Sequence, residues 1–137
     1  MRKLLLQEIY YPNEWKIFVC CIMLNQTTGT QVHQVIKDLF RRYPNPKRMS
    51  EADPVELAEV IRSCGLYNRR AAILIRMSNE FRKGDWLEPK DLYGLGQYAQ
   101  ESWRIFIRGE VFTPHDKELK KYIEWKRTLL MRKTVKK

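Results

Sequence analysis

The sequence predicts a single all-α domain. Apolar residues recur at helical spacing along almost the whole of the 137-residue chain, and no segment alternates apolar and polar residues for long enough to make a strand. Prolines, glycines and capping side chains divide this pattern into segments of ordinary helix length. Because 44% of the residues are hydrophobic, a domain of this size can bury a substantial core.

The helices can be placed in order from their apolar faces and from the residues at their ends. Thr28 or Thr30 can cap the second helix, and Asp53 is a preferred N-cap for the third because proline follows it. Gly65 is expected to end that helix in the left-handed conformation, and Gly84 to end the next. We therefore expect helices at about 14–25, from 28 or 30 to 43, 54–64, 68–82, 97–107 and 114–131, with a short helix before residue 94.

The domain is expected to cover residues 1–130, and residues 131–137 to form a basic tail with a frayed end. Such a tail can contact phosphate, contribute to nuclear targeting or simply be solvated. The longest apolar stretch, residues 17–24, is too short to span a membrane. We therefore expect no membrane partner.

The charge and the cysteines narrow the class of protein. Lys and Arg number 26 against 16 Asp and Glu, a net charge of +10, which favours a polyanionic partner without choosing between DNA, RNA and an acidic membrane. Cys20, Cys21 and Cys64 are too few and too poorly spaced for a disulfide framework, a structural zinc or an iron–sulfur cluster. We expect buried, reduced thiols in an intracellular protein, with no metal site and no cofactor.

The segment Leu92-Tyr93-Gly94-Leu95-Gly96 predicts a tight turn between two helices. Its glycines can adopt backbone angles closed to other residues, and its leucines would pack beneath the turn. The outward N–H groups and the positive end of the next helix would then suit one DNA phosphate. An ordinary corner between helices is the alternative.

Asp116 follows this turn and has two compatible interpretations. Thr113-Pro114-His115-Asp116 is a good helix start with Asp116 at the third helical position, so Asp116 can be a structural capping acid. A carboxylate held at a helix N-terminus also stays ionised. It could stabilise positive charge on a deoxyribose ring and orient or deprotonate an attacking water.

Several further segments occur with the hairpin and Asp116, and together they resemble one family. They are Glu14-Trp15-Lys16, Leu24-Asn25-Gln26-Thr27-Thr28-Gly29, Gly65-Leu66-Tyr67, Tyr98, Trp103-Arg104-Ile105-Phe106, Leu119 and Tyr122. In this order they resemble the endonuclease III superfamily of helix–hairpin–helix DNA glycosylases, and within it the glycosylase domain of the methyl-CpG-binding domain protein 4 family. The resemblance runs from about residue 6 to residue 125. It implies the helix–hairpin–helix glycosylase fold without an iron–sulfur cluster.

The resemblance also assigns a base pocket and catalytic residues. It places the extruded pyrimidine near Leu6, Gln7 and Tyr98, and gives Asp116 and Tyr98 catalytic roles. From the residues alone, Gln7 would be an ordinary surface residue and Tyr98 an ordinary core aromatic. Tyr98 stands where bifunctional relatives have a Schiff-base lysine, which implies a monofunctional enzyme. Lys117 is next to Asp116 but is misplaced for that chemistry.

The DNA-binding residues that the resemblance implies are Gln26, Thr27, Gly29, Leu66, Gly94, Leu95, Gly96 and Lys117. Leu66 would act as an apolar wedge; the alternative is a hydrophobic contact that closes the Gly65 cap. The family usually has arginine at Gln26 and lysine at Glu118, which puts base flipping and pocket charge in question. Basic residues expected as candidate phosphate contacts are Arg69, Arg70, Lys120 and Lys121.

These features predict a monofunctional, monomeric and nuclear DNA glycosylase of base excision repair. Its partner would be double-stranded DNA that carries a mispaired or damaged pyrimidine, with thymine or uracil opposite guanine as substrate. Two alternatives stay open from the sequence. One is a non-catalytic helix–hairpin–helix DNA-binding module, and the other is a glycosylase for a different base.

Overall fold

The computed structural model describes residues 2–135, and every regular element in that range is helical. This confirms the predicted all-α class. The helices are α1 (Leu6–Tyr10), α2 (Glu14–Leu24), α3 (Gly29–Arg42), α4 (Pro46–Ser50), α5 (Pro54–Val60), α6 (Tyr67–Lys83), α7 (Gln97–Phe106) and α8 (Lys117–Val135), with short 3-10 turns η1 (Arg62–Cys64) and η2 (Pro89–Asp91).

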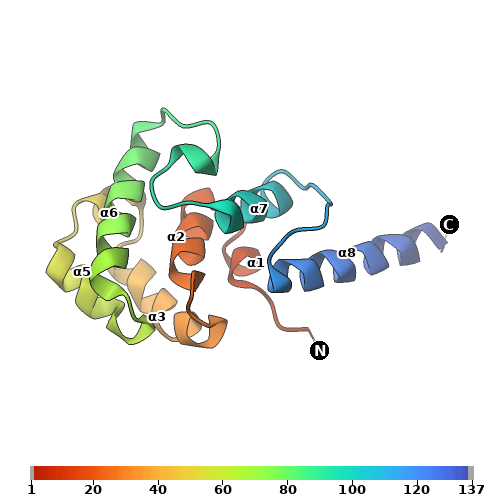
Figure 1. Cartoon of the computed structure of the whole chain (residues 1–137), viewed down its shortest axis with the longest axis horizontal. Coiled ribbons are helices and arrows are strands. Elements are labelled where there is room, and N and C mark those ends of the chain that lie inside the picture. The colour runs from red at the N-terminus through yellow and green to blue at the C-terminus, as the bar shows by residue number, and fades with distance from the viewer. Residues whose placement is uncertain (1, 136–137) are drawn as a thin grey trace.

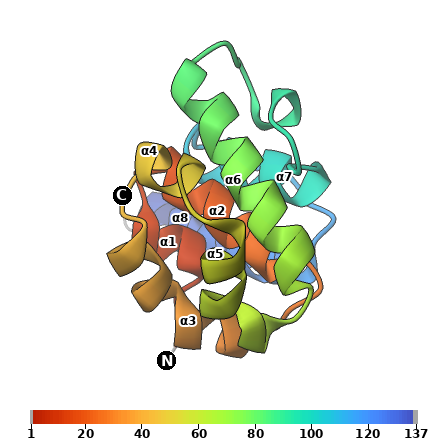
Figure 2. The same cartoon turned by 90° about the vertical axis from the view of Figure 1, so that its left-hand side faces the viewer.

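Helix α2 forms the centre of the molecule. It carries an almost unbroken apolar run, and eight of its residues, from Trp15 to Met23, are buried. It packs against α1, α3, α6 and α7. Helices α3, α5 and α6 lie on one side of α2, and α1, α7 and α8 on the other (Figure 1); a quarter turn shows α6 crossing in front of α2 (Figure 2). The arrangement leaves two groups of helices joined through one buried helix.

Several helix ends lie where the capping residues predict them. Thr28 caps α3, because its Oγ1 accepts a hydrogen bond from the N–H of Gln31 at 3.3 Å. Asp53 caps α5 through a 2.8 Å bond from the N–H of Val55. Gly84 adopts the left-handed conformation at the end of α6, which confirms its predicted role.

Two short helices, α1 and α4, were not predicted from the sequence. Helix α1 has only five residues, too few to show a period. Helix α4 follows a proline-rich segment that we interpreted only as the end of α3. In fact Asn45 accepts a bond from the N–H of Arg48 at 2.9 Å and Pro46 occupies the first helical position, so the same segment also begins a helix.

Two predicted helix ends are wrong. The helix expected at 54–64 stops as an α-helix at Val60 and continues only as the turn η1. Gly65 has φ 78° and ψ 168°, so it is not left-handed; Leu66 takes the left-handed conformation instead. The last helix begins at Lys117 rather than at residue 114, because Asp116 is its N-cap.

Helix α8 leaves the body of the domain and projects outward (Figure 1). It runs without a break across residue 130 and through Val135, and residues 136–137 of the predicted tail lie outside the described part. The division into a domain and a tail stays a prediction.

All three cysteines are free and buried, as predicted. Within residues 2–135 no helix combines the length and apolarity needed to cross a bilayer.

Candidate active site and DNA-binding surface

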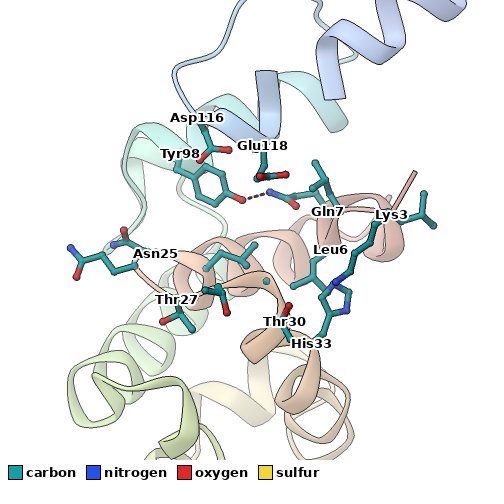
Figure 3. Close-up of a pocket in the computed structure, with 16 residues that line it drawn as sticks. Lys3, Leu6, Gln7, Asn25, Thr27, Thr30, His33, Tyr98, Asp116 and Glu118 are labelled. Carbon is teal, nitrogen blue, oxygen red and sulfur yellow. Dashed lines mark hydrogen bonds between the residues drawn. The ribbon is translucent and has the colours of Figure 1, made fainter. Parts of the chain in front are cut away.

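A pocket of about 610 Å³ opens between the two groups of helices. Its walls come from the segment before and in α1, the end of α2, the start of α3, α7 and the start of α8. Figure 3 shows Gln7, Tyr98 and Asp116 together on one wall. The residues that line it are Lys3, Leu4, Leu5, Leu6, Gln7, Leu24, Asn25, Gln26, Thr27, Thr28, Gly29, Thr30, His33, Tyr98, Asp116 and Glu118.

The pocket has a polar pair that joins α1 to α7. Gln7 is fully buried, and its Nε2 donates to the hydroxyl of Tyr98 at 2.7 Å and to Oγ of Ser102 at 3.2 Å. Within the described chain its Oε1 accepts no hydrogen bond, although it is buried. A buried acceptor without a donor is costly in the empty protein. It is therefore a group that a ligand N–H can satisfy.

Tyr98 is held in its protonated form. Burial is the main reason that its pKa lies far above the ordinary value, and the nearby thiol of Cys21 acts in the same direction. Its oxygen already accepts a hydrogen bond from Gln7, so the hydroxyl proton is available to another acceptor. Tyr98 is thus a neutral donor in the pocket wall.

Asp116 combines a structural and a pocket-facing role. Its Oδ2 accepts a hydrogen bond from the N–H of Leu119 at 3.0 Å, and its backbone oxygen accepts from the N–H of Lys120. The side chain is half-buried and lines the pocket. The N-cap position favours a negative charge there, because the helix dipole and free N–H groups face it. The capping interpretation of Asp116 is therefore confirmed, at the N-cap rather than at the third helical position. Its catalytic interpretation stays a prediction.

The residue before Asp116 is anchored to α7. The N–H of His115 donates to both carboxylate oxygens of Glu101, at 3.0 and 3.1 Å, and Nδ1 of His115 lies 2.8 Å from Oε2. Glu101 is only 5% exposed. The carboxylate fixes the end of the loop that delivers Asp116 to the pocket. Sequence reasoning missed Glu101; its signal was an acid on the apolar face of a predicted helix.

The pocket wall opposite Asp116 carries basic rather than acidic side chains. Lys3 and His33 lie side by side, away from Asp116 (Figure 3). Burial, then Lys3 and Lys37, lower the pKa of His33, so its ring is neutral at neutral pH. Glu118 lines the pocket near Asp116, with its Oε1 3.4 Å from Nζ of Lys121. Neither Lys3 nor His33 was singled out from the sequence.

The hairpin between η2 and α7 has the packing that its sequence predicts. Leu92 and Leu95 are buried beneath it. Gly94 has φ 81°, whereas Gly96 has an ordinary negative φ of −107°, so only Gly94 needs a glycine conformation. The N–H groups of Gly94 and Gly96 donate to no acceptor in residues 2–135. They lie at the N-terminus of α7, where an anion is favoured.

Helix α6 holds the hairpin from below. The N–H of Tyr93 donates to Oε1 of Glu80 at 2.7 Å, and the guanidinium of Arg76 lies 3.8 Å from the centre of the Tyr93 ring. A Cβ on Gly94 would overlap Cγ2 of Ile73. The N–H of Tyr93 is thus not free for a phosphate, and the close approach to α6 is a second reason for glycine at position 94.

Two loops on the pocket side contain strained backbone. Gln26 has φ 66° and Leu66 has φ 50°, and they are the non-glycine residues with positive φ in the described range. Both side chains are exposed, Leu66 at 52%. The alternative role of Leu66, a hydrophobic contact that closes a Gly65 cap, does not apply, because Gly65 is not left-handed. The role of Leu66 as a wedge stays a prediction. Strain at exposed residues is typical of a functional constraint.

Arg70 is not a surface residue. We expected it among the phosphate contacts, but it is 3% exposed and donates only to backbone oxygens. Thr27 also has an internal partner, since its hydroxyl donates to the backbone oxygen of Cys64 at 3.0 Å. Gly29 and Lys117 are exposed at the starts of α3 and α8. Arg69, Lys120 and Lys121 are exposed as well, so they stay candidates for phosphate contacts.

Within the described part of the chain, no three His, Cys, Asp or Glu side chains converge on one point. What the fold does bring together is a helical hairpin with free N–H groups, a capped carboxylate and a pocket between two groups of helices. These features define a helix–hairpin–helix protein with a pocket of about 610 Å³.

The comparisons with known proteins agree with this class. The family model described as "HhH-GPD superfamily base excision DNA repair protein" matches residues 19–137, and the chain belongs to that superfamily. The expected resemblance to the endonuclease III superfamily and to the methyl-CpG-binding domain protein 4 family is confirmed. The helix–hairpin–helix glycosylase fold is confirmed with it.

Among the similar proteins is a methyl-CpG-binding domain protein 4-like protein of Arabidopsis thaliana, 33% identical over 90% of this chain and 28% of that protein. A thymine-DNA glycosylase of Aeropyrum pernix is 37% identical over 61% of this chain and 41% of that protein. The solved structure of a thermostable thymine-DNA glycosylase matches 80% of this chain and 53% of its own with a TM-score of 0.69 at 22% identity. The chain thus spans about half or less of these relatives.

Proposed function

We propose that this chain is a monofunctional DNA glycosylase that hydrolyses the N-glycosidic bond of thymine or uracil mispaired with guanine, or of a related damaged pyrimidine. The observation that carries the proposal is the pocket in which the Asp116 carboxylate, the Tyr98 hydroxyl and the buried Gln7 amide line one wall. Membership of the base excision repair superfamily and similarity to a thymine-DNA glycosylase support it.

The polar groups of the pocket complement the edge of a keto pyrimidine. Thymine and uracil offer an N–H between two carbonyl oxygens. The unpartnered Oε1 of Gln7 can accept from that N–H, and the Tyr98 hydroxyl can donate to an oxygen. The base must leave the duplex to reach them, since the pocket lies inside the protein surface.

Asp116 would supply the chemistry. As the base leaves, positive charge grows on the deoxyribose ring, and a fixed carboxylate stabilises that charge. Its Oδ2 holds the N–H of Leu119, and the carboxylate faces the pocket, where it can orient or deprotonate water. The anchoring of His115 by Glu101 keeps the carboxylate in place.

The absence of an amine at position 98 supports a monofunctional enzyme. Tyr98 occupies the position where the resemblance implies a lysine in bifunctional relatives. Lys3 lines the pocket, but beside His33 on the other wall (Figure 3). A monomer acting in the nucleus on double-stranded DNA is the setting we propose for this activity.

The test is a single-turnover assay on a labelled duplex with one G·T or G·U mispair, developed with alkali. We expect strand breaks only after alkali treatment, and a loss of about 10²–10³-fold in the Asp116→Asn variant, the size of effect that follows loss of one electrostatic stabiliser. Asparagine is a good N-cap, so the variant should stay folded. Equal cleavage by both proteins would refute the mechanism.

A panel of duplexes decides between the alternatives. Excision of adenine opposite an oxidised purine, with no excision of thymine or uracil, would assign the fold to a different base. Binding to every duplex with cleavage of none would leave a DNA-binding module.

A further inference from the structure

A buried cation joins the two loops that carry the exposed, strained residues. Arg70 lies in the first turns of α6. Its Nη1 donates to the backbone oxygens of Cys64 at 2.9 Å and Gly65 at 3.1 Å, and its Nη2 donates to the backbone oxygen of Asn25. One guanidinium therefore spans the loop before α6 and the loop after α2.

The acceptors are the immediate neighbours of the left-handed residues. Asn25 precedes Gln26, and Gly65 precedes Leu66, so Arg70 fixes the peptide group on the N-terminal side of each. The hydroxyl of Thr27 adds a second link, because it donates to the same oxygen of Cys64 that Arg70 binds. Unfavourable φ values persist only where the surroundings fix them, and these bonds supply that restraint.

The strain does not serve core packing. The side chains of Gln26 and Leu66 point to solvent, and Leu66 is 52% exposed. The loop of Gln26 lines the pocket through Asn25, Gln26 and Thr27, and the hydroxyl of Thr27 links it to the loop of Leu66 at Cys64. The two exposed side chains therefore project from loops whose backbones are linked to each other through Arg70 and Thr27.

The hydrogen bonds that link the two loops suit an arginine better than a lysine. Within residues 2–135 no carboxylate forms an ion pair with Arg70, and its partners are carbonyl dipoles. A guanidinium presents donors in a planar fork that can reach carbonyls on two sides at once, whereas an ammonium is a point donor. The uncompensated charge also lies beneath loops that would face phosphates.

We propose that Arg70 is a positioning residue that holds Gln26 and Leu66 at a fixed separation, so that both side chains enter the duplex together when a base is extruded. The proposal rests on the proposed function. Arg70 itself touches neither base nor sugar and acts through the backbone of the two loops. Without it, each loop can relax to ordinary φ values independently of the other.

The test separates base extrusion from catalysis. Arg70→Lys and Arg70→Met are made in the Asp116→Asn background, and a G·T duplex with 2-aminopurine beside the mispair reports extrusion by its fluorescence at saturating protein. We expect Arg70→Met to lose most of the fluorescence increase and Arg70→Lys to retain an intermediate part. The dissociation constant for an undamaged duplex should change by less than about threefold, since phosphate contacts dominate that binding. With Asp116 present, Arg70→Met should lower the rate of single-turnover cleavage at saturating protein by about 10²-fold, the size of effect expected when a substrate is slightly misplaced.

The matched control is Arg82→Met, which removes the same charge from an exposed site in the last turn of α6. It should leave the fluorescence signal unchanged. If Arg70→Met does not fold, Arg70→Lys carries the test, and a full signal with full cleavage in that variant would overturn the proposal. A signal that falls only in proportion to the folded fraction, and recovers on cooling, would also overturn it. If the parent extrudes the probe but cleaves no substrate, the proposed function fails and the role of Arg70 is still measured.

Discussion

Replacing Gly94 with alanine should destabilise the hairpin for two separable reasons. Gly94 has φ 81°, and an L-residue in the left-handed region costs about 1–2 kcal/mol. The added Cβ would also overlap Cγ2 of Ile73 on α6, and overpacking of this kind costs about 1–3 kcal/mol. The free energy of unfolding should therefore fall by about 2–5 kcal/mol, a large part of the roughly 5–15 kcal/mol available to a domain.

The chain offers a matched control two residues away. Gly96 has φ −107°, and a Cβ there would have no atom within 4 Å. Gly96→Ala should cost no more than about 1 kcal/mol, from the loss of a good N-cap residue. Both variants would be compared with the parent by urea unfolding at equilibrium, with midpoint and slope fitted together.

A double variant isolates the steric part. Ile73→Ala removes Cγ2, so Gly94→Ala should cost about 1–3 kcal/mol less in that background than in the parent, while the backbone part remains. If Gly94→Ala proves as stable as Gly96→Ala, the packing of the hairpin on α6 is wrong. If the two backgrounds give equal losses, the backbone conformation alone explains the glycine.

Three further predictions follow from the site. Asp116→Ala should lower the free energy of unfolding by about 0.5–2 kcal/mol in urea titration, because the N-cap bond to α8 is lost. Asp116→Asn should stay near the parent, and equal losses in the two variants would show that Asp116 does not cap α8. Borohydride should trap no protein–DNA adduct during glycosylase turnover, because Tyr98 stands in place of an amine; an adduct that disappears in Lys3→Met would contradict this. Burial raises the pKa of Cys21 to about 12 from an ordinary 9.0, so its stabilising effect is complete below pH 9.0 and is lost towards pH 12. Stability should fall over that alkaline window, and less steeply in Cys21→Ala; identical slopes would refute it.

Much of the fold follows from local chemistry that a sequence displays. Thr28 and Asp53 were recognisable as caps, and both cap helices here. The hairpin leucines were predictable as buried because they flank glycines between two helical periods. Asp116 was recognisable as a capping acid, but proline and threonine upstream suggested an earlier start, and the carboxylate itself became the N-cap.

The site depended more on resemblance and on tertiary context. Gln7 has no local feature that predicts full burial, and only the family pattern placed it beside Tyr98. Arginine is a residue type usually found on the surface, and the burial of Arg70 depends on backbone carbonyls from two loops that are distant in the sequence. The left-handed backbone of Leu66 could not be read from a residue type that avoids that conformation.

The pocket wall is completed by a contact between distant parts of the chain. Gln7 and Tyr98 are separated by 91 residues, and Asp116 arrives still later along the chain. Contacts of such long sequence separation form after the loops between them have closed, so they are slow to form. The pocket is then expected to be among the last features to be completed during folding. Recovery of cleavage activity after dilution from denaturant would therefore report completion of the whole tertiary structure, and would lag behind the recovery of helical circular dichroism.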